Sequence, residues 1–108
     1  MAEGFYTMTF ETPLGVGSGV IYLHDGKAHG GDASMYYRGT YEVEGDTLRA
    51  SVAIGTYVKQ HVPTSVFGVD AANLTVQGNI SGSQIAGTAT AAQAPGVVMK
   101  LTLNRIAD

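Results

Sequence analysis

The sequence predicts an all-β protein: a small, closed, antiparallel up-and-down β-barrel of about eight strands. Segments in which apolar and polar residues alternate recur at intervals of about 8 to 12 residues, as in sandwiches and barrels. Hardly any segment shows a helical period, and short turn sequences rich in glycine, aspartate and serine separate the segments. Short consecutive turns favour a meander, and closure removes the exposed strand edges that an open sheet would present.

Five strands are expected in the first half of the chain. They cover residues 4–11, 16–24, 27–30, 35–43 and 47–54. Most of them place apolar side chains on one face at every second position, as a half-buried strand does. The alternation is cleanest in the fifth, where Leu48, Ala50, Val52 and Ile54 share one face. Turn-forming residues lie between the strands, so each strand is expected to pair with the next.

The second half of the chain completes the predicted barrel. We expect residues 56–62 to be extended and residues 65–70 to form a crossing loop, because Pro63 interrupts the pattern. The last strands are expected at residues 73–80, 85–90 and 97–105. Residues 1–108 are predicted to form a single domain, since one core is typically built from about 100 to 150 residues.

Two turns organise the N-terminal half. Asp25 and Gly26 separate two alternating runs, and this pair is typical of a type I′ hairpin, whose two central residues both need a positive φ. Gly30, Gly31 and Asp32 are interpreted as a structural turn. In this turn the Asp32 side chain is expected to hydrogen-bond the backbone amides that follow it.

Three tyrosines follow that turn. Tyr37 and Tyr41 are expected to pack inside with their hydroxyls paired, while Tyr36 takes the opposite face. Aromatic residues in strands mostly fill cores. An exposed Tyr36 beside Val20 and Tyr22, on the outward face of a neighbouring strand, would instead form an apolar patch suited to self-association. Val20, Tyr22 and Tyr36 are therefore the candidate dimer face.

An acidic turn is the second candidate interaction site. Glu42, Glu44 and Asp46 lie within five residues of one another. Most such turns are simply solvated, but carboxylates at the rim of an interface can also guide a basic protein partner. These three residues are the candidate partner-binding residues. The chain has a net charge of -3 and only six Lys and Arg residues, so direct nucleic-acid binding is not expected.

Several kinds of chemistry lack a signature. The chain has no cysteine, which excludes disulfides and cysteine nucleophiles. His24, His29 and His61 do not have the spacing of zinc ligands, and no motif for a serine nucleophile or a phosphate-binding loop is found. We therefore expect no catalytic residues, cofactor or metal, and no enzyme activity. The chain shows neither a secretory signal nor an apolar run long enough for a membrane helix, so a cytoplasmic protein without membrane contact is expected.

Motifs in the first half of the chain follow one another in a particular order and spacing. They are Gly4, Tyr6 and Phe10, then Gly17, Gly19 and Val20, then Asp25 and Gly26, then Gly30, Gly31 and Asp32, and finally Tyr37 and Gly39. With these motifs the chain resembles the GrlR family of negative regulators associated with bacterial type III secretion.

The resemblance implies a lipocalin-like, eight-stranded barrel that forms a homodimer. It also implies repression by binding a helix-turn-helix activator rather than DNA. In the best-known family member, an exposed Glu-Asp-Glu-Asp run after the Tyr-x-Gly strand matters for partner binding. The matching positions here are residues 43–46, where Glu44 and Asp46 are acidic and the other two are not.

Two functions are therefore expected from the sequence. The first is a non-enzymatic, GrlR-like regulatory protein that acts by protein–protein interaction and negatively regulates a transcriptional activator. The alternative is a carrier or sensor that binds a small apolar ligand inside the barrel. For this alternative, the glycines at positions 17, 19, 39, 78 and 87 would provide the room.

Overall fold

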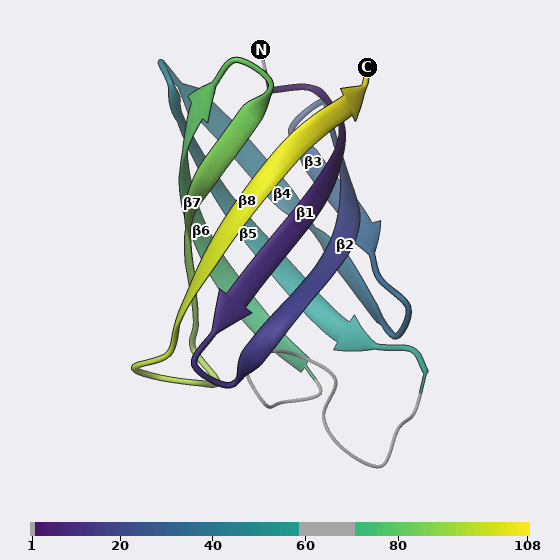
Figure 1. Ribbon diagram of the computed structural model, residues 1–108, viewed down its shortest axis with the longest axis vertical. Coiled ribbons are helices and arrows are strands. Elements are labelled where there is room, and N and C mark those ends of the chain that lie inside the picture. Colours follow the sequence, from purple (N-terminus) through teal and green to yellow (C-terminus); the bar gives the residue numbers. More distant parts are fainter. Residues whose placement is uncertain (1, 59–70) are drawn as a thin grey trace.

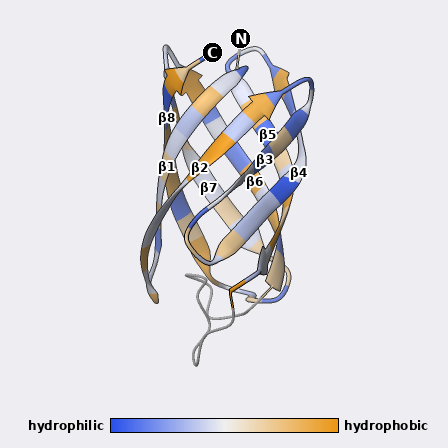
Figure 2. Cartoon of the chain, turned by 90° about the vertical axis from the view of Figure 1, so that its right-hand side faces the viewer, coloured by the Kyte–Doolittle hydropathy of each residue, from blue (hydrophilic) through white to orange (hydrophobic). Residues whose placement is uncertain are grey.

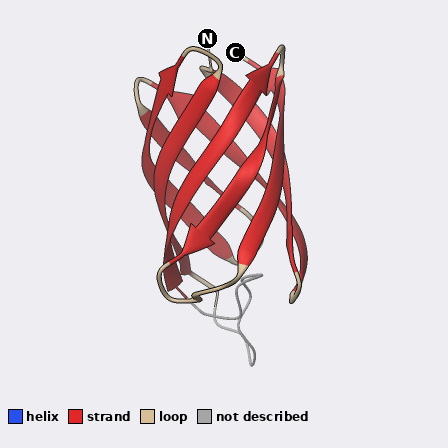
Figure 3. Ribbon diagram, turned by 90° about the vertical axis from the view of Figure 1, so that its left-hand side faces the viewer, coloured by secondary structure: helices blue, strands red, loops and turns tan. Residues whose placement is uncertain are grey.

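The computed structural model describes residues 2–58 and 71–108, which form eight strands and no helix (Figure 3). The strands are β1 (Gly4–Thr12), β2 (Gly15–His24), β3 (Lys27–Gly31), β4 (Met35–Glu44), β5 (Thr47–Thr56), β6 (Ala71–Ser81), β7 (Gln84–Ala91) and β8 (Val98–Ala107). Each strand pairs antiparallel with the next, and β8 pairs with β1 (Figure 1). The predicted all-β, closed up-and-down barrel is confirmed, and its form is consistent with a lipocalin-like barrel.

The pairing of β1 with β8 closes the sheet. Met8 lies opposite Leu103, and Phe10 lies opposite Leu101. The register shifts between Phe5 and Tyr6, near the end of the pairing. Because every strand has two hydrogen-bonded neighbours, this part of the chain has no free sheet edge that could pair with another chain.

Alternation along the strands builds one apolar core inside the barrel. Figure 2 shows hydrophobic and hydrophilic residues interspersed along the strands. The largest side chains that are fully buried are Tyr6, Met35 and Ile85. In β5, Leu48, Val52 and Ile54 are buried as the alternation predicts, and Ala50 packs against the same core. The inward face of each strand is thus set by its sequence period.

Glycines stand where neighbouring strands approach most closely. A Cβ atom at Gly30 or Gly39 would overlap the carbonyl oxygen of Val20 or Ser51, respectively, and one at Gly87 would overlap a carbonyl oxygen of β6. Only glycine fits at such points, which are typical of the bends that curve a sheet into a barrel.

The β2–β3 hairpin turns as predicted. Asp25 has a φ of 52° and Gly26 a φ of 77°, the two positive angles of a type I′ turn. The β4–β5 and β6–β7 hairpins each place a glycine in the left-handed region, Gly45 with φ 62° and Gly82 with φ 61°. Residues with little steric cost at positive φ thus set all three of these hairpins.

The predicted turn at Gly30, Gly31 and Asp32 is correct only for the aspartate. Gly30 and Gly31 belong to β3, and the chain turns over residues 32–34. The two glycines do not adopt a positive φ. Gly30 is required instead by its close approach to β2, a constraint that depends on how the strands bend.

The strand predicted over residues 56–62 is wrong where the structure describes it. β5 ends at Thr56, and Tyr57 and Val58 form a bend. Both backbone amides of the bend donate to the carbonyl oxygen of Ser34, at 2.9 Å and 3.3 Å. They therefore join the β3–β4 turn instead of extending the sheet. The rest of the predicted strand, and the predicted loop over residues 65–70, lie outside the described residues.

The segment of Ala2 and Glu3, just before β1, lies at the end of the barrel that carries the chain termini (Figure 1). Ala2 is buried, and its carbonyl oxygen accepts a 2.7 Å hydrogen bond from the Tyr6 hydroxyl. The Glu3 carboxylate accepts a 2.8 Å hydrogen bond from the backbone amide of Asp25. The Glu3 carbonyl oxygen accepts a 3.2 Å hydrogen bond from the Arg105 side chain. This terminal strap, Ala2 and Glu3, thereby connects the β2–β3 hairpin with β8.

Candidate functional site

An apolar cavity lies inside the barrel. The volume in which the centre of a water molecule can be placed is about 80 Å³. Among the described residues that line it, Asp32 is the one charged group, and Tyr37 carries the one hydroxyl. Sites for drug-sized ligands typically measure about 300 to 1,000 Å³. Side chains therefore fill most of the interior, and the remaining space fits a much smaller molecule.

Asp32 and Tyr37 form a hydrogen-bonded pair in the cavity wall. The Tyr37 hydroxyl donates to Oδ2 of Asp32. The other carboxylate oxygen, Oδ1, accepts hydrogen bonds from the backbone amides of Ser34 at 2.9 Å and Met35 at 2.8 Å. These bonds confirm the prediction that the Asp32 side chain bonds the amides that follow it. Three donors thus hold the carboxylate in a fixed orientation. The backbone carbonyl of Asp32 also accepts the Tyr57 hydroxyl at 2.6 Å.

The environment of Tyr37 stabilises its neutral form. Burial raises the pKa of the Tyr37 phenol well above its usual range, and the hydrogen bond to Asp32 and the negative charge of Asp32 raise it further. The phenol therefore acts as a hydrogen-bond donor near neutral pH. The predicted pairing of the Tyr37 and Tyr41 hydroxyls is wrong, because Tyr37 donates to a carboxylate on the preceding turn.

Two inward glycines of β2, Gly17 and Gly19, make room for aromatic rings. The Phe10 ring packs over Gly17, and the Tyr37 hydroxyl would lie 2.7 Å from a Cβ at Gly19. Phe10 and Tyr37 also contact each other edge to face, with 6.4 Å between ring centroids. The expectation that glycines provide room for a ligand is not met, because the described lining of the cavity contains no glycine.

The sequence pattern did not identify Asp32 as part of an interior site. Its position just before a strand predicts a turn aspartate, and its local hydrogen bonds fit that prediction. The residue that could have indicated an interior role for Asp32 is Tyr37, an inward residue of β4, the strand that follows the turn. A buried tyrosine hydroxyl needs a polar partner, and the nearest inward-pointing polar residue is Asp32.

The candidate dimer residues lie together on the outside of the barrel. Val20 of β2 is paired with Gly31 of β3, and Gly31 is paired with Tyr36 of β4. Val20 is 38% exposed, and Tyr22 and Tyr36 are each 40% exposed. We call the outward side of these three strands the β2–β4 face. It carries the predicted residues as one patch, and Gly31 places no side chain between Val20 and Tyr36.

Both tyrosine rings of the β2–β4 face are held by their own chain. Tyr22 stacks on His24, with 5.5 Å between ring centroids and 15° between ring planes. The Tyr36 ring covers Gly55 of β5, and the Arg38 guanidinium lies 5.8 Å from the centre of that ring. Rings that are already ordered lose less conformational entropy when a partner binds.

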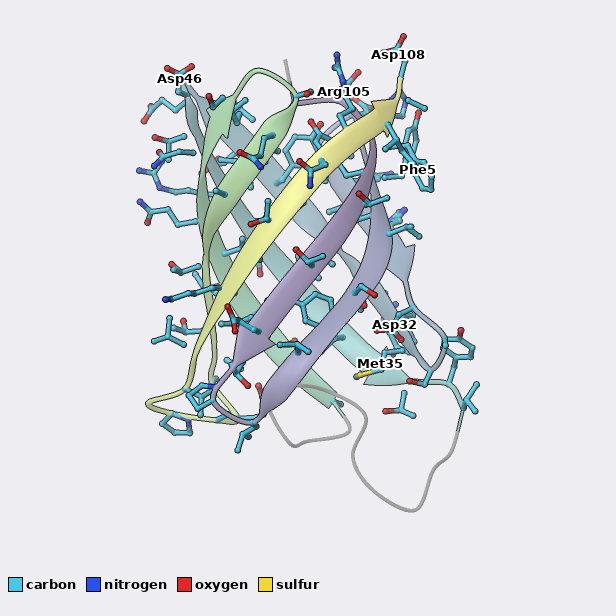
Figure 4. The ribbon with its side chains drawn as sticks, in the orientation of Figure 1. Phe5, Asp32, Met35, Asp46, Arg105 and Asp108 are labelled. Carbon is cyan, nitrogen blue, oxygen red and sulfur yellow. The ribbon has the colours of Figure 1, made fainter. Side chains whose placement is uncertain are left out.

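The candidate acidic residues lie at the opposite end of the barrel from Asp32. Glu42, Glu44 and Asp46 are all exposed. Glu44 pairs with Arg49 at 3.8 Å across the β4–β5 hairpin. Figure 4 shows Asp46 at the end of the barrel where Arg105 lies, away from Asp32 and Met35. The acidic turn and the interior cavity are therefore separate sites.

The histidines do not gather into a metal site in the described part of the chain. His24 is paired with Lys27 across the β2–β3 hairpin, whereas His29 is opposite Tyr22. The Nδ1 atom of His24 lies 3.7 Å from Oε1 of Glu3. Within residues 2–58 and 71–108, no three His, Asp or Glu side chains come together around one point. His61 lies outside these residues.

A second hollow lies on the outside of the barrel near the β1–β2 turn. It measures about 520 Å³ and is open to solvent. Its wall mixes Thr9, Glu11, Ser18 and Lys100 with apolar atoms. Both signs of charge occur in this wall, which is more polar than that of the interior cavity. The interior cavity is therefore the better candidate for a specific site.

Comparison with known proteins adds no assignment. Among the described residues, no helix is long and apolar enough to cross a membrane. No family model matches the chain, and no curated protein is significantly similar to it. The resemblance to the GrlR family stays a prediction from the sequence.

Proposed function

We propose that the protein is a non-enzymatic regulatory protein that works through protein–protein contacts and forms a homodimer through its β2–β4 face. The observation that carries the proposal is the patch of Val20, Tyr22 and Tyr36, three exposed apolar side chains on β2 and β4, the two strands that flank β3. Contiguous apolar surface of this kind is typical of interaction sites, and aromatic residues are enriched in them.

The charges along β4 support a second copy of the chain as the occupant of this face. Arg38, Thr40 and Glu42 occupy successive outward positions of β4. A two-fold axis that passes near Thr40 places Arg38 of each copy opposite Glu42 of the other. Such a contact is self-complementary, and opposite charges across an interface fix the register of the partners.

Charge reversal tests this dimer. Analytical ultracentrifugation of the full chain is expected to show a dimer that Arg38→Glu or Glu42→Arg weakens by about tenfold, since close charge pairs across an interface contribute on the order of 1.5 kcal/mol or more. The double variant with both changes is expected to restore the dimer. Lys100→Glu on β8 is the matched control and leaves the dimer unchanged. A monomeric wild-type chain would contradict the proposed dimer.

The proposed regulatory role is negative regulation of a transcriptional activator, as the resemblance implies. Its candidate contact is the acidic turn, whose Glu44 and Asp46 are exposed at the β4–β5 hairpin. Affinity capture from the native host is expected to recover a DNA-binding regulator with a basic surface. Capture is expected to fail with the combined Glu44→Gln and Asp46→Asn variant, which leaves Glu42 and its dimer contact unchanged, and to persist with Glu11→Gln. Equal capture by both variants would argue against this contact.

The second candidate function is binding of a small ligand in the interior, as a carrier or sensor. The observation that favours it is an apolar cavity inside the barrel with one hydrogen-bonded carboxylate in its wall. Binding sites for small molecules commonly combine apolar walls with a few fixed polar groups. The dimer contacts lie on the outside of the barrel, so the two functions are compatible and can be tested separately.

A further inference from the structure

We infer that the interior cavity binds a small organic cation, a primary amine on a short aliphatic chain, with its ammonium group on the Asp32 carboxylate. The inference rests on the second candidate function, ligand binding in the barrel, and does not depend on the dimer. The charge of the cavity wall, the hydrogen-bonding capacity of Asp32, the neighbouring rings and the size of the space support it.

The charge of the cavity wall favours a cation. Asp32 is the only charged residue among the described residues of the wall, and no lysine or arginine is found there. The ion pairs of the described residues are His24 with Glu3 and Arg49 with Glu44, so neither involves Asp32. An anionic ligand would meet a like charge in apolar surroundings without a counter-ion, which is unfavourable. An ammonium group would instead neutralise the carboxylate.

Asp32 retains capacity for one more hydrogen bond. An ionised carboxylate has about four acceptor sites on its two oxygens. The amides of Ser34 and Met35 occupy Oδ1, and the Tyr37 hydroxyl occupies one site on Oδ2. The remaining site on Oδ2 is held in position by these three donors. A primary ammonium group carries three donors and forms a strong, charge-assisted bond with a carboxylate.

Aromatic rings add to the attraction for a positive charge. Phe10 and Tyr37 both line the cavity and contact each other edge to face at 83° between their planes. The face of an aromatic ring attracts a nearby cation electrostatically. Because Tyr37 also donates to Asp32, one of the two rings is attached to the proposed anchor itself.

The size of the space limits the length of the ligand. At about 10 to 15 Å³ for each water-sized group, a cavity of about 80 Å³ holds roughly five to eight such groups. A primary amine with four to six carbons fits this range. Figure 4 shows Asp32 near the end of the barrel away from Arg105. The ammonium group is therefore placed toward that end, and the aliphatic chain extends among residues such as Ile85 and Leu101.

The test compares three probes of equal chain length with the full chain at neutral pH. Isothermal titration calorimetry is expected to show that n-pentylamine binds at least ten times more tightly than 1-pentanol, and that pentanoate does not bind. Asp32→Asn keeps an oxygen for the Ser34 and Met35 amides but removes the charge. It is expected to bind the amine and the alcohol equally. Ala50→Leu fills the cavity and is expected to abolish binding of all three probes.

Each outcome decides a different question. Equal binding of amine and alcohol by the wild-type chain overturns the amine assignment but supports ligand binding in the interior. Binding of none of the three probes overturns both the assignment and the second candidate function. Amine binding that persists in Ala50→Leu places the amine outside the cavity and also overturns the assignment. The comparison of probes uses the wild-type chain, so it holds even where Asp32→Asn does not fold.

Discussion

Asp32 connects a local turn with the interior of the barrel. Its hydrogen bonds to Ser34 and Met35 are local, and they start β4 at a defined residue. Its bond to Tyr37 reaches an inward side chain of that strand. One carboxylate therefore sets both the direction of the chain and the orientation of a buried phenol, and a change at either residue affects the other.

Tyr37→Phe is expected to change how stability depends on pH. Above about pH 10, a tyrosine in the unfolded chain loses its proton. Folded Tyr37 keeps its proton because its pKa is raised, so the folded state then binds more protons. The stabilisation from Tyr37 is thus present below about pH 10 and is lost as pH rises, by up to about 1.4 kcal/mol per pH unit.

Urea denaturation from about pH 8 to about pH 11 measures this effect. Tyr37→Phe is expected to show a shallower loss of stability in the alkaline range than the wild-type chain. Burial also raises the pKa of Tyr6 and of Tyr41, so part of the slope remains in the variant. Identical slopes for the two proteins would show that Tyr37 does not retain its proton.

Gly39→Ala is expected to destabilise the barrel because its new Cβ would overlap the backbone of β5. Forcing an extra carbon into closely packed structure typically costs about 1 to 3 kcal/mol, and here the neighbouring atom cannot rotate away. Gly45→Asn is the control, since a Cβ there meets nothing within 4 Å and asparagine tolerates positive φ. Chemical denaturation measures both variants. An unchanged midpoint for Gly39→Ala would contradict the close approach.

At the scale of elements, the hairpins were the most predictable part of the fold. The Asp25-Gly26 turn follows from local residue chemistry, and its two positive φ values agree with it. The predictions for Gly30 and for residues 57 and 58 were wrong because there the contacts come from other elements of the barrel, Val20 of β2 and Ser34 of the β3–β4 turn. The bend at Tyr57 is stabilised by Ser34, a contact that no local pattern encodes.

Gly26→Ala is expected to weaken the β2–β3 hairpin, while Asp25→Asn leaves it nearly unchanged. A left-handed conformation costs a residue with a Cβ about 1 to 2 kcal/mol, whereas Asn-Gly is as well suited to a type I′ turn as Asp-Gly. Gly26 has a φ of 77°, so the cost applies there in full. Thermal denaturation of both variants gives the comparison. Equal melting temperatures would indicate that another turn type forms at little cost.

At the scale of the whole molecule, the closed ring of strands was predictable and the interior site was not. Strand number, order and inward faces follow from alternation and turn spacing, and Leu48, Val52 and Ile54 are buried as expected. The volume left between side chains depends on how eight strands curve together. The sequence pattern therefore predicted that glycines leave room for a ligand, whereas side chains and backbone atoms occupy the space beside those glycines.

Because one core is shared by all strands, the barrel is expected to unfold as a unit. Tyrosine fluorescence, which reports on residues such as Tyr37, and circular dichroism, which reports on all strands, are expected to give the same denaturation midpoint. Leu101→Ala, in the core on β8, is expected to lower the unfolding free energy by about 2 to 5 kcal/mol and to shift both signals together. Val98→Ala, on the exposed side of that strand, is the control. Separate midpoints would reveal a partly folded state.

Because β1 pairs with β8, the same closed ring of strands could also be formed by a chain that begins at a different strand. Phe5 lies beside Ala107, so the two chain ends meet at one end of the barrel (Figure 1). Joining these ends through a short linker and opening the chain at the Gly45 hairpin would leave every strand with the same two neighbours. A circular permutant of this kind would separate what depends on strand neighbourhood from what depends on the terminal strap.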